Sequence, residues 1–421
     1  MPRFVNPPLM RQAEIKPPGS DRKAREAQPA PAARVTLATA LLAAGTSWNA
    51  GNIGPVTSAL SADFSVSLTA VGLLSGTVFF AGVLATTTVA PELAKRTGVA
   101  GAARLGCILC GAGNLLFALS PWFAGLLVAR VLVGGGLGLA LVLGPIFARE
   151  YGGVRLLGVF GAGVTLGMAA ALGVGSVLED AGVEWRVAFV VSAAAGVMAL
   201  PFLPARMQFG GPDRKARGLL GSMVRNASLW RVGLVYVGSF GVQLIVGAWL
   251  IHYLTEDDGM AVSFAGLLAF VMFGFSALAR DLGGTLSARG VSPVVLVGIA
   301  PLLATTGLVA IAIDRSFAVA LPAVVLMGIG FSTPYAVMMD EAQRLFPKQP
   351  LAPITVLQLA ANAVPMVVIP IVGAALAAGS GEAALFALAA FCGIGGVANL
   401  KPAVPATDPA KADAKRSISR A

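Results

Sequence analysis

The chain has 421 residues, of which 57% are hydrophobic and only 12% are charged. Soluble domains carry about 25% charged residues, so this chain has too few charges to cover a water-facing surface of its size, which excludes an ordinary soluble protein. The formal net charge of +10 would suit a nucleic-acid binder, but the positions of the basic residues, given below, favour a membrane topology instead.

Residues 1–34 are rich in Pro, Lys and Arg, and this composition predicts a disordered basic tail. Apolar runs of about 20 residues follow, each long enough to cross a bilayer. Helices are favoured because lipid demands internally paired backbone groups, and because the runs lack the short alternation of barrel strands. The first six predicted spans are Val35 to Ala59, Leu68 to Ala90, Ala102 to Leu119, Trp122 to Ala148, Leu156 to Val177 and Val187 to Leu203.

A polar and basic linker, residues 205–231, separates these spans from six more. The second six predicted spans are Val232 to Leu254, Val262 to Ala279, Val294 to Ile313, Phe317 to Met339, Ile354 to Ala378 and Ala383 to Leu400. A second basic tail follows at 401–421. The sequence therefore predicts an all-α integral membrane protein with two six-helix bundles, residues 35–204 and 232–400.

Lys and Arg collect in every second connection between the spans. Of the 30 basic residues, only Arg186 and Arg315 fall in the other connections, and Arg130 lies within a span. Those other connections are instead acidic. Because cytoplasmic loops carry an excess of Lys and Arg, we expect both termini to be cytoplasmic, and the +10 charge needs no nucleic-acid partner.

The two sets of six spans repeat each other's features. Short loops with Gly and Arg follow the second and eighth spans, and the fourth and tenth spans share a Gly-x-Gly pattern followed by a proline, Pro145 and Pro334. Many secondary transporters are built from such repeats, with the substrate site near the bilayer midplane between them.

These features resemble the major facilitator superfamily over about residues 35–400. The resemblance rests on Arg130, Gly134 and Gly138 in the fourth span, on Trp185-Arg186-Val187-Ala188-Phe189 at the start of the sixth, and on two loop motifs. The family's G-x-L-a-D-R-x-G-R loop is similar to the segments that contain Leu93, Arg96, Gly98, Gly284, Leu286, Arg289 and Gly290, although Lys95 replaces the usual Asp. The resemblance implies a fold of two bundles related by pseudo-two-fold symmetry, and a conformational role for these loops.

Within that family, the segment Arg280-x-x-Gly283-Gly284 is similar to nitrate/nitrite porters and to several organic-anion permeases. The proline-containing motif that drug–proton antiporters carry in the fifth helix is absent from the segment beginning at Gly163, which disfavours export of drugs.

Arg130 is the main candidate for a functional charge, because charges deep in a membrane are costly and usually have a purpose. It lies about 12 Å along the fourth span, estimated at about 1.5 Å per residue. Its planar guanidinium suits a carboxylate or a similar anion, so Arg130 is predicted to bind substrate or to take part in ion coupling. The alternative is a packing arginine that donates to carbonyl groups.

Polar residues on four other spans could line the cavity that the resemblance implies. Asn49 and Asn52 share one face of the first span, and Gln358 and Asn362 share one face of the eleventh. Gln243, Trp249 and Tyr335 complete this set. The alternative for each amide is a hydrogen bond between helices, and Trp249 could be an interfacial anchor.

His252 is the only histidine, and it lies near the end of the seventh span, where it could couple transport to H+. The alternative is a solvated interfacial histidine. No metal site and no cofactor are expected, because the C-x-x-C of Cys107 and Cys110 lies inside an apolar run with no partner Cys or His pair. No phosphate-binding G-x-x-x-x-G-K-[ST] motif is present, so ATP-driven pumping is not expected. No G-x-S-x-G motif is present either, and a Ser-His-Asp arrangement would need His252 beside a serine within a helix, so enzymatic function is not expected.

The sequence thus predicts a secondary active transporter, with a small organic or inorganic anion as substrate and H+ or Na+ as coupling ion. A monomer in a bacterial inner membrane is expected. The alternatives are an exporter of hydrophobic compounds and a non-transporting receptor or scaffold on a transporter fold.

Overall fold

The computed structural model describes residues 32–204, 223, 225–256, 260–346 and 351–400, and every element within them is a helix or a helical turn. Apart from residues 32–34, the predicted tails 1–34 and 401–421 lie outside the described residues, as does most of the predicted linker 205–231.

The first half of the molecule comprises residues 32–204. α2 (Ala32–Ser47), two 3-10 turns (Trp48–Ala50 and Gly54–Val56) and α3 (Thr57–Asp63) form an interrupted first pass. The next passes are formed by α4 (Leu68–Gly72), a π-helical turn (Leu73–Val78), α5 (Phe79–Leu119), α6 (Phe123–Asp180) and α7 (Trp185–Val197). Non-helical backbone at Gly98 divides α5, and non-helical backbone at Gly152 and Gly153 divides α6, so each of these contributes to two passes.

The second half begins at α9 (Ala227–Tyr236), which continues through a π-helical turn (Val237–Gly241) into α10 (Val242–Thr255). The remaining passes are α11 (Val262–Ala288), a π-helical turn (Val294–Ile299) with α12 (Ala300–Ile313), α13 (Phe317–Ser332) with α14 (Tyr335–Leu345), α15 (Leu351–Ala377) and α16 (Gly381–Ala398).

Two helices differ in extent from the predicted spans in ways that bear on function. The first pass is not continuous: Pro55 has no N–H to donate, and the backbone there forms 3-10 turns. α11 does not end at Ala279 but continues to Ala288, so Arg280 lies within the helix and not in a loop. A hydropathy window marks where apolar residues stop, whereas a helix continues as long as its backbone bonds are made.

Nine helices in the described ranges are long and apolar enough to cross a membrane. One of them, Leu68–Leu119, is divided at Gly98 and accounts for two passes. The interrupted first pass and the shorter apolar helix Trp185–Val197 complete the set. The structure is therefore consistent with about twelve passes, arranged as two bundles.

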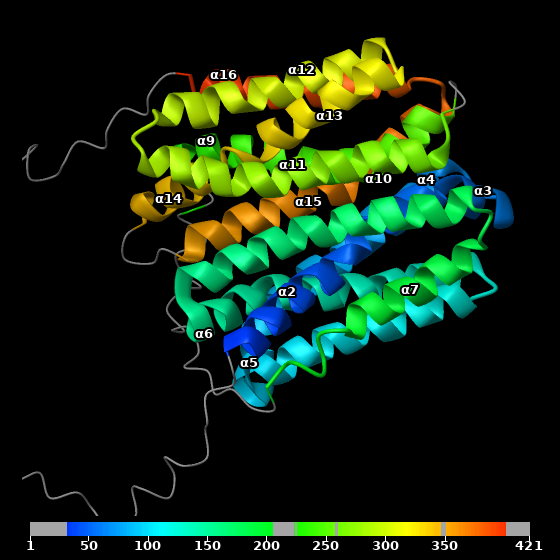
Figure 1. The fold of residues 1–421 in the computed structure, drawn as a ribbon, viewed down its shortest axis with the longest axis horizontal. Coiled ribbons are helices and arrows are strands. Elements are labelled where there is room, and N and C mark those ends of the chain that lie inside the picture. Colours follow the sequence, from blue (N-terminus) through cyan, green and yellow to red (C-terminus); the bar gives the residue numbers. More distant parts are fainter. Residues whose placement is uncertain (1–31, 205–222, 224, 257–259, 347–350, 401–421) are drawn as a thin grey trace, which may run out of the picture.

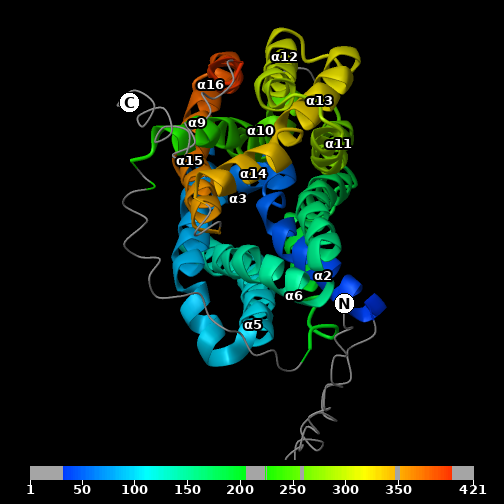
Figure 2. The same ribbon diagram turned by 90° about the vertical axis from the view of Figure 1, so that its left-hand side faces the viewer.

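Figure 1 shows the two bundles side by side, with their helices running roughly along one direction. Viewed end-on in Figure 2, α5 and α6 of the first half lie below α12, α13 and α16 of the second. Across the boundary α6 packs against α11, and α4 packs against α15. Helices of both halves thus pack together along the boundary between the bundles.

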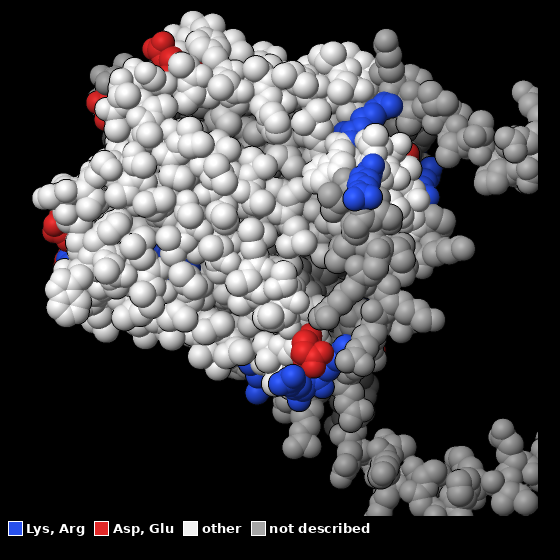
Figure 3. Space-filling view, turned by 180° about the vertical axis from the view of Figure 1, so that it is seen from behind, with Lys and Arg blue, Asp and Glu red and all other residues white. Residues whose placement is uncertain are grey.

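Charged residues concentrate at the two ends of the helices, with uncharged surface between them (Figure 3). We name the two ends by their charge. The basic end carries Lys95, Arg96, Arg289 and Arg344, and the acidic end carries Asp63, Glu184, Glu256, Asp314 and Glu382. This separation agrees with the alternation of charge that the sequence predicts for the connections.

The two halves contact each other near the acidic end. Ser58 Oγ lies 3.3 Å from His252 Nδ1, and Ser263 Oγ donates to Asp180 Oδ2 at 2.8 Å. At Gly72 a Cβ atom would lie only 2.7 Å from the Cα of Pro370, so glycine permits the close approach of α4 and α15 there. The acidic end is therefore the end at which the halves are held together in this structure.

Candidate functional site

A narrow space with room for about one water molecule lies between the two halves. Its walls come from the first half through α2, α5 and α6, and from the second half through residues before and within α10 and within α15. The lining residues are Ser47, Ala50, Phe80, Leu137, Leu141, Val164, Met168, Phe240, Leu244 and Asn362. Its position between the bundles makes this cavity the candidate substrate site.

A polar cluster of the second half adjoins this cavity on the side of the basic end. Tyr236 and Gln358 each lie one helical turn before a lining residue, Phe240 and Asn362 respectively. The Tyr236 hydroxyl donates to Gln358 Oε1 at 2.6 Å, and the amide of Asn362 donates to the Gln358 carbonyl at 2.6 Å. These bonds join α9 to α15 and fix the cavity wall.

Arg280 of α11 lies in the same cluster. Its guanidinium carbon is 4.3 Å from the centre of the Tyr335 ring and 6.0 Å from that of Phe240. The ring of Tyr335 lies 6.1 Å from that of Tyr236. Among the described residues, the contacts that position this arginine are thus aromatic faces.

Polar atoms in this region lack partners within the described part of the chain. Arg280 Nε is buried without a hydrogen bond, and so is the hydroxyl of Ser332, three residues before Tyr335. A buried donor that has no acceptor costs free energy comparable to a lost hydrogen bond. Such a pair of atoms on neighbouring helices is what a binding site for a polar group would present.

Arg130 occupies a different place. Its side chain is 1% exposed and lies inside the first half. It donates from Nε to the Leu74 carbonyl, from Nη1 to Asn52 Oδ1 and from Nη2 to the Asn49 carbonyl, each at 3.1 Å. The guanidinium also stacks on Phe79 at 4.3 Å. In this structure Arg130 therefore has the packing geometry that was the alternative to anion binding, and it does not line the central cavity.

The carbonyls that Arg130 reaches come from irregular backbone. Asn49 belongs to the 3-10 turn of the first pass, and Leu74 belongs to the π-helical turn after α4. Irregular helices leave carbonyls without their usual intrahelical donor, and inside a membrane neighbouring side chains must satisfy them. Arg130 does this for two helices at once.

Asn49 and Asn52 are likewise bonded inside the first half. Asn114 donates to Asn49 Oδ1 at 2.6 Å, and Asn52 donates to Asn114 Oδ1 and to Ser192 Oγ, both at 3.2 Å. Trp48 Nε1 donates to the same serine at 2.9 Å. This network fits the alternative of interhelical hydrogen bonds, and sequence reasoning did not single out Asn114 or Ser192.

Gln243 and Trp249 are both buried, Gln243 within the second half and Trp249 where the second half meets the first. Gln243 donates to Ser276 Oγ at 2.6 Å, which in turn donates to the Gly328 carbonyl at 3.0 Å. Trp249 Nε1 donates to the Ile369 carbonyl at 2.9 Å, and its ring lies against Gly72 of the first half. Trp249 therefore belongs to the contact between the halves near the acidic end.

His252 lies at that same contact. Besides Ser58 of the first half, it reaches Glu256 of its own half, with 3.1 Å between Nε2 and Oε2. The histidine is 6% exposed, which does not fit a solvated interfacial residue. It thus bridges an acidic group and the opposite bundle.

The residues of the two loop motifs lie at the basic end. Gly98 and Gly290 both have positive φ, 76° and 85°, in the left-handed region that favours glycine, and each marks a reversal of the chain. Arg96 pairs with Glu92 at 3.5 Å, while Leu286 accepts from the amide of Val291 in the turn. Leu93, Gly284 and Arg289 flank these turns.

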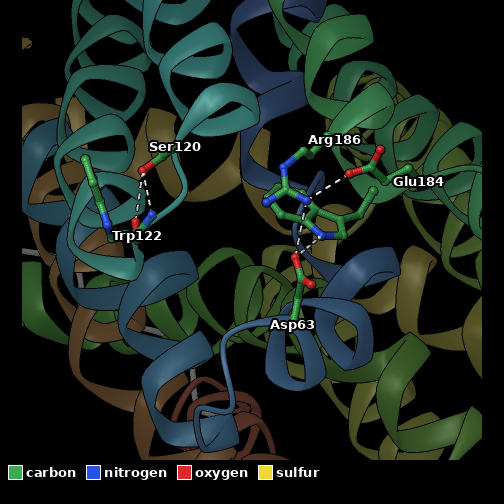
Figure 4. Close-up of polar contacts among 6 residues, drawn as sticks. Asp63, Ser120, Trp122, Glu184 and Arg186 are labelled. Carbon is green, nitrogen blue, oxygen red and sulfur yellow. Dashed lines mark hydrogen bonds and ion pairs between the residues drawn. The ribbon is translucent and has the colours of Figure 1, made fainter.

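The start of the sixth pass has a structural partner at the acidic end (Figure 4). Trp185 Nε1 donates to Asp63 Oδ2 at 3.1 Å, and Arg186 pairs with Asp63 at 3.3 Å and with Glu184 at 2.8 Å. Ser120 donates to the Trp122 carbonyl in the neighbouring connection. These bonds tie the end of the first pass to the sixth, away from the cavity.

Of the residues predicted to line a cavity, the structure brings Tyr335, Gln358 and Asn362 together. The residues that sequence reasoning missed here are Arg280 and Tyr236. A signal for Arg280 existed in its resemblance to anion porters, but hydropathy placed it beyond the end of its span. Within the described ranges, no group of three or more His, Cys, Asp or Glu side chains is placed to hold a metal ion.

Solved structures of membrane transporters share this fold. A bacterial homologue of the human lysosomal transporter Spinster, inward-facing and unoccupied, has a TM-score of 0.71 at 19% identity, covering 88% of this chain and 96% of that chain. A D-xylose–proton symporter has a TM-score of 0.68 at 15% identity, covering 89% and 98%. The inward-open xylose transporter XylE of E. coli has a TM-score of 0.71 at 13% identity, covering 91% and 100%.

At such identities the likeness shows the fold alone. No curated protein matches the chain significantly in sequence. The family model of the Major Facilitator Superfamily, however, matches residues 37–357, which is most of the chain. The apolar helices that are long enough to cross a membrane, and their arrangement in two bundles, agree with this match. The chain therefore belongs to the Major Facilitator Superfamily.

Proposed function

We propose that this protein is a secondary transporter of a small organic or inorganic anion, and that Arg280 binds the negative charge. Membership of the superfamily supports secondary transport in general. The observation that carries the finer proposal is the buried Nε of Arg280, which has no hydrogen-bond partner among the described residues and lies beside the central cavity.

A charge within the membrane-spanning part of a protein needs compensation by nearby polar or charged groups. Arg130 has its acceptors within the first half, whereas the contacts of Arg280 are to the aromatic rings of Tyr335 and Phe240. Cation–π contacts compensate only part of the desolvation of a guanidinium. A substrate carboxylate or similar anion would supply the missing acceptor, and the planar guanidinium suits its geometry.

Transport would follow from alternating contacts of the two halves. We propose that the basic end faces the cytoplasm, as the positive-inside rule predicts, with both termini on that side of a bacterial inner membrane. Contacts at the acidic end then close the external side in this structure. Substrate binding shifts the populations of the inward and outward states to the extent that it favours one of them. We further propose that the protein acts as a monomer, with a binding site between its own halves.

His252 is the proposed coupling residue for H+, in preference to Na+. It lies between Ser58 of one half and Glu256 of the other, so its protonation would change a contact between the halves. Replacing His252 with Gln would keep a polar side chain there while removing the titratable group. The expected result is anion exchange without accumulation driven by a pH gradient, measured in proteoliposomes.

A second candidate function is export of hydrophobic compounds, which the apolar lining of the cavity favours. The two candidates differ in what binds. An anion transporter needs Arg280, whereas a neutral hydrophobic compound does not.

The test is a thermal-shift screen of purified protein against the sodium salts of nitrate, formate, acetate and benzoate at matched ionic strength. A ligand at about 100 times its Kd stabilises the folded state by about 2.7 kcal/mol. We expect at least one anion to raise the Tm of the wild type but not that of Arg280→Gln. Stabilisation of that variant equal to the wild type would refute the proposal.

Arg315→Gln is the matched control for this screen. Arg315 also stacks on a tyrosine, with its guanidinium carbon 4.1 Å from the ring of Tyr253, but it lies at the acidic end beside Glu382. This variant removes the same charge from a similar aromatic contact away from the cavity. It should keep the response of the wild type to the anion.

A further inference from the structure

The regular helix of the sixth pass is too short to cross a bilayer by itself. α7 has 13 residues and ends at Val197, which gives a length of about 20 Å at about 1.5 Å per residue. The hydrocarbon core of a bilayer is about 30 Å thick, and turns carry the backbone on from Val197 to Leu203 at the basic end. In the described part of the chain, the carbonyls of Pro201 and Leu203 accept no backbone donor. This end of the pass therefore needs donors from other helices.

Two arginines from other helices supply these donors. Arg34 of α2 donates from Nη2 to the Pro201 carbonyl at 3.1 Å, and Arg104 of α5 donates from Nη2 to the Leu203 carbonyl at 2.6 Å. Both α2 and α5 pack against α7 (Figure 1). Because the two carbonyls are only two residues apart, the two positive charges are held near one another. The C-terminal end of a helix favours cations, which fits this placement.

The carbonyls use only part of what the two guanidinium groups can donate. A guanidinium has several N–H groups in a fixed plane, and each carbonyl here takes one of them. Arg104 Nε is buried and has no hydrogen-bond partner among the described residues. Within the same ranges, no Asp or Glu pairs with Arg34 or Arg104. Two neighbouring like charges repel each other, and an anion bound to both would relieve this repulsion.

Exposed apolar side chains follow each arginine toward the middle of the membrane. Leu37 lies three residues after Arg34 and is 42% exposed, and Ile108 lies four residues after Arg104 and is 50% exposed. Side chains three or four residues apart share one face of a helix. A positive group at the basic end is thus continued by apolar surface on both α2 and α5. This is the order of a phospholipid, with a charged headgroup above its acyl chains.

We infer that Arg34 and Arg104 form a binding site for the phosphate of an anionic phospholipid in the leaflet at the basic end. Phosphate oxygens accept paired, charge-assisted hydrogen bonds from guanidinium groups. Basic pockets between membrane helices on the cytoplasmic side bind anionic headgroups, and the proposed orientation places the basic end on that side. Inorganic phosphate could use the same donors but would leave Leu37 and Ile108 without acyl chains. The site does not involve Arg280 and does not depend on the transported solute.

The experiment measures lipid affinity by native mass spectrometry of the purified full-length protein in a non-ionic detergent. The probes are dioleoyl phosphatidylglycerol, dioleoyl phosphatidylcholine with the same chains but no net charge, and inorganic phosphate. We expect phosphatidylglycerol to bind at least about fivefold more tightly than phosphatidylcholine. Each basic residue near an anionic lipid contributes about fivefold in affinity, so Arg34→Gln/Arg104→Gln should weaken binding of phosphatidylglycerol by about 25-fold.

Arg149→Gln/Arg155→Gln is the matched control. Arg149 and Arg155 are exposed on α6 at the basic end of the same half, so this variant loses the same net charge away from α7. It should bind phosphatidylglycerol as the wild type does. If the double variant at Arg34 and Arg104 does not elute as a folded monodisperse protein, Arg34→Gln alone replaces it, with an expected loss of about fivefold, because Arg34 is exposed and its removal leaves Arg104 in place.

Three outcomes would overturn the inference. Equal affinity for phosphatidylglycerol and phosphatidylcholine would show that the anionic charge is not recognised. Unchanged binding in the variants at Arg34 and Arg104, or an equal loss in the control variant, would show that the lipid is held by the general positive charge of this end. Inorganic phosphate that binds as tightly as the lipid, and that these variants no longer bind, would make this a site for a free anion.

Discussion

Two arginines within the helices of this molecule, Arg130 and Arg280, stand in opposite situations. Arg130 donates three hydrogen bonds to oxygens of Leu74, Asn52 and Asn49. Arg280 stacks on Tyr335, with its Nε lacking a partner in the described part of the chain. Removing one member of a satisfied buried network strands the other members, whereas removing an uncompensated charge removes a cost. The same chemical substitution should therefore have different effects at the two positions.

Arg130→Gln should lower the free energy of unfolding by about 3 kcal/mol or more, because it leaves buried carbonyls without donors. Arg280→Gln should change the stability of the unliganded protein by less than about 1 kcal/mol, or increase it, because the Nε that is lost has no acceptor among the described residues. Thermal unfolding of both variants in the same detergent, without added anion, measures the difference. Equal destabilisation of the two variants would mean that Arg280 is a packing residue like Arg130.

At the scale of the helices, hydropathy alone locates the passes but not their interruptions. The apolar runs predict the passes because lipid requires long apolar segments. They do not reveal that the first pass breaks into 3-10 turns between Trp48 and Val56, or that α11 extends past Ala279 and includes Arg280. Both features depend on tertiary contacts: the break is satisfied by Arg130 from another helix, and Arg280 is held by Tyr335. A single sequence contains no direct signal for such pairings.

The loop glycines, in contrast, are features that a motif does predict. Gly290 has φ of 85° and open space around its Cβ position, so backbone strain is the expected cost of a side chain there. Gly290→Ala should destabilise the protein by about 1–2 kcal/mol, since L-residues disfavour the left-handed region. The measurement is thermal unfolding, together with uptake of an anion that binds.

Gly274→Ala is the matched control for the loop glycine. Gly274 also has open space at its Cβ position, but it lies within α11 and its φ is not positive. Alanine in a helix interior is favoured over glycine by up to about 1 kcal/mol, so this variant should be neutral or more stable. If both alanine variants have the same stability, the positive φ of Gly290 does not constrain the loop.

For the molecule as a whole, the distribution of contacts between the halves defines which end must open. Ser263 donates to Asp180 Oδ2 at 2.8 Å, and His252 lies 3.3 Å from Ser58, all near the acidic end. The central cavity and the polar cluster around Arg280 lie nearer the basic end than these contacts do. Alternating access therefore requires the contacts at the acidic end to separate during each cycle.

The pair Asp180→Cys and Ser263→Cys tests this requirement, because the two side chains meet across the boundary between the halves. The native thiols Cys107, Cys110 and Cys392 are buried and should not compete for oxidation. Oxidation should join the two introduced cysteines, stop uptake into proteoliposomes of the anion that the thermal-shift screen identifies, and leave binding of that anion in detergent intact. Reduction should restore uptake, and each single variant should be insensitive to the oxidant. Full cross-linking with undiminished uptake would show that these helix ends stay together throughout transport, and the route for the anion would then have to bypass the acidic end.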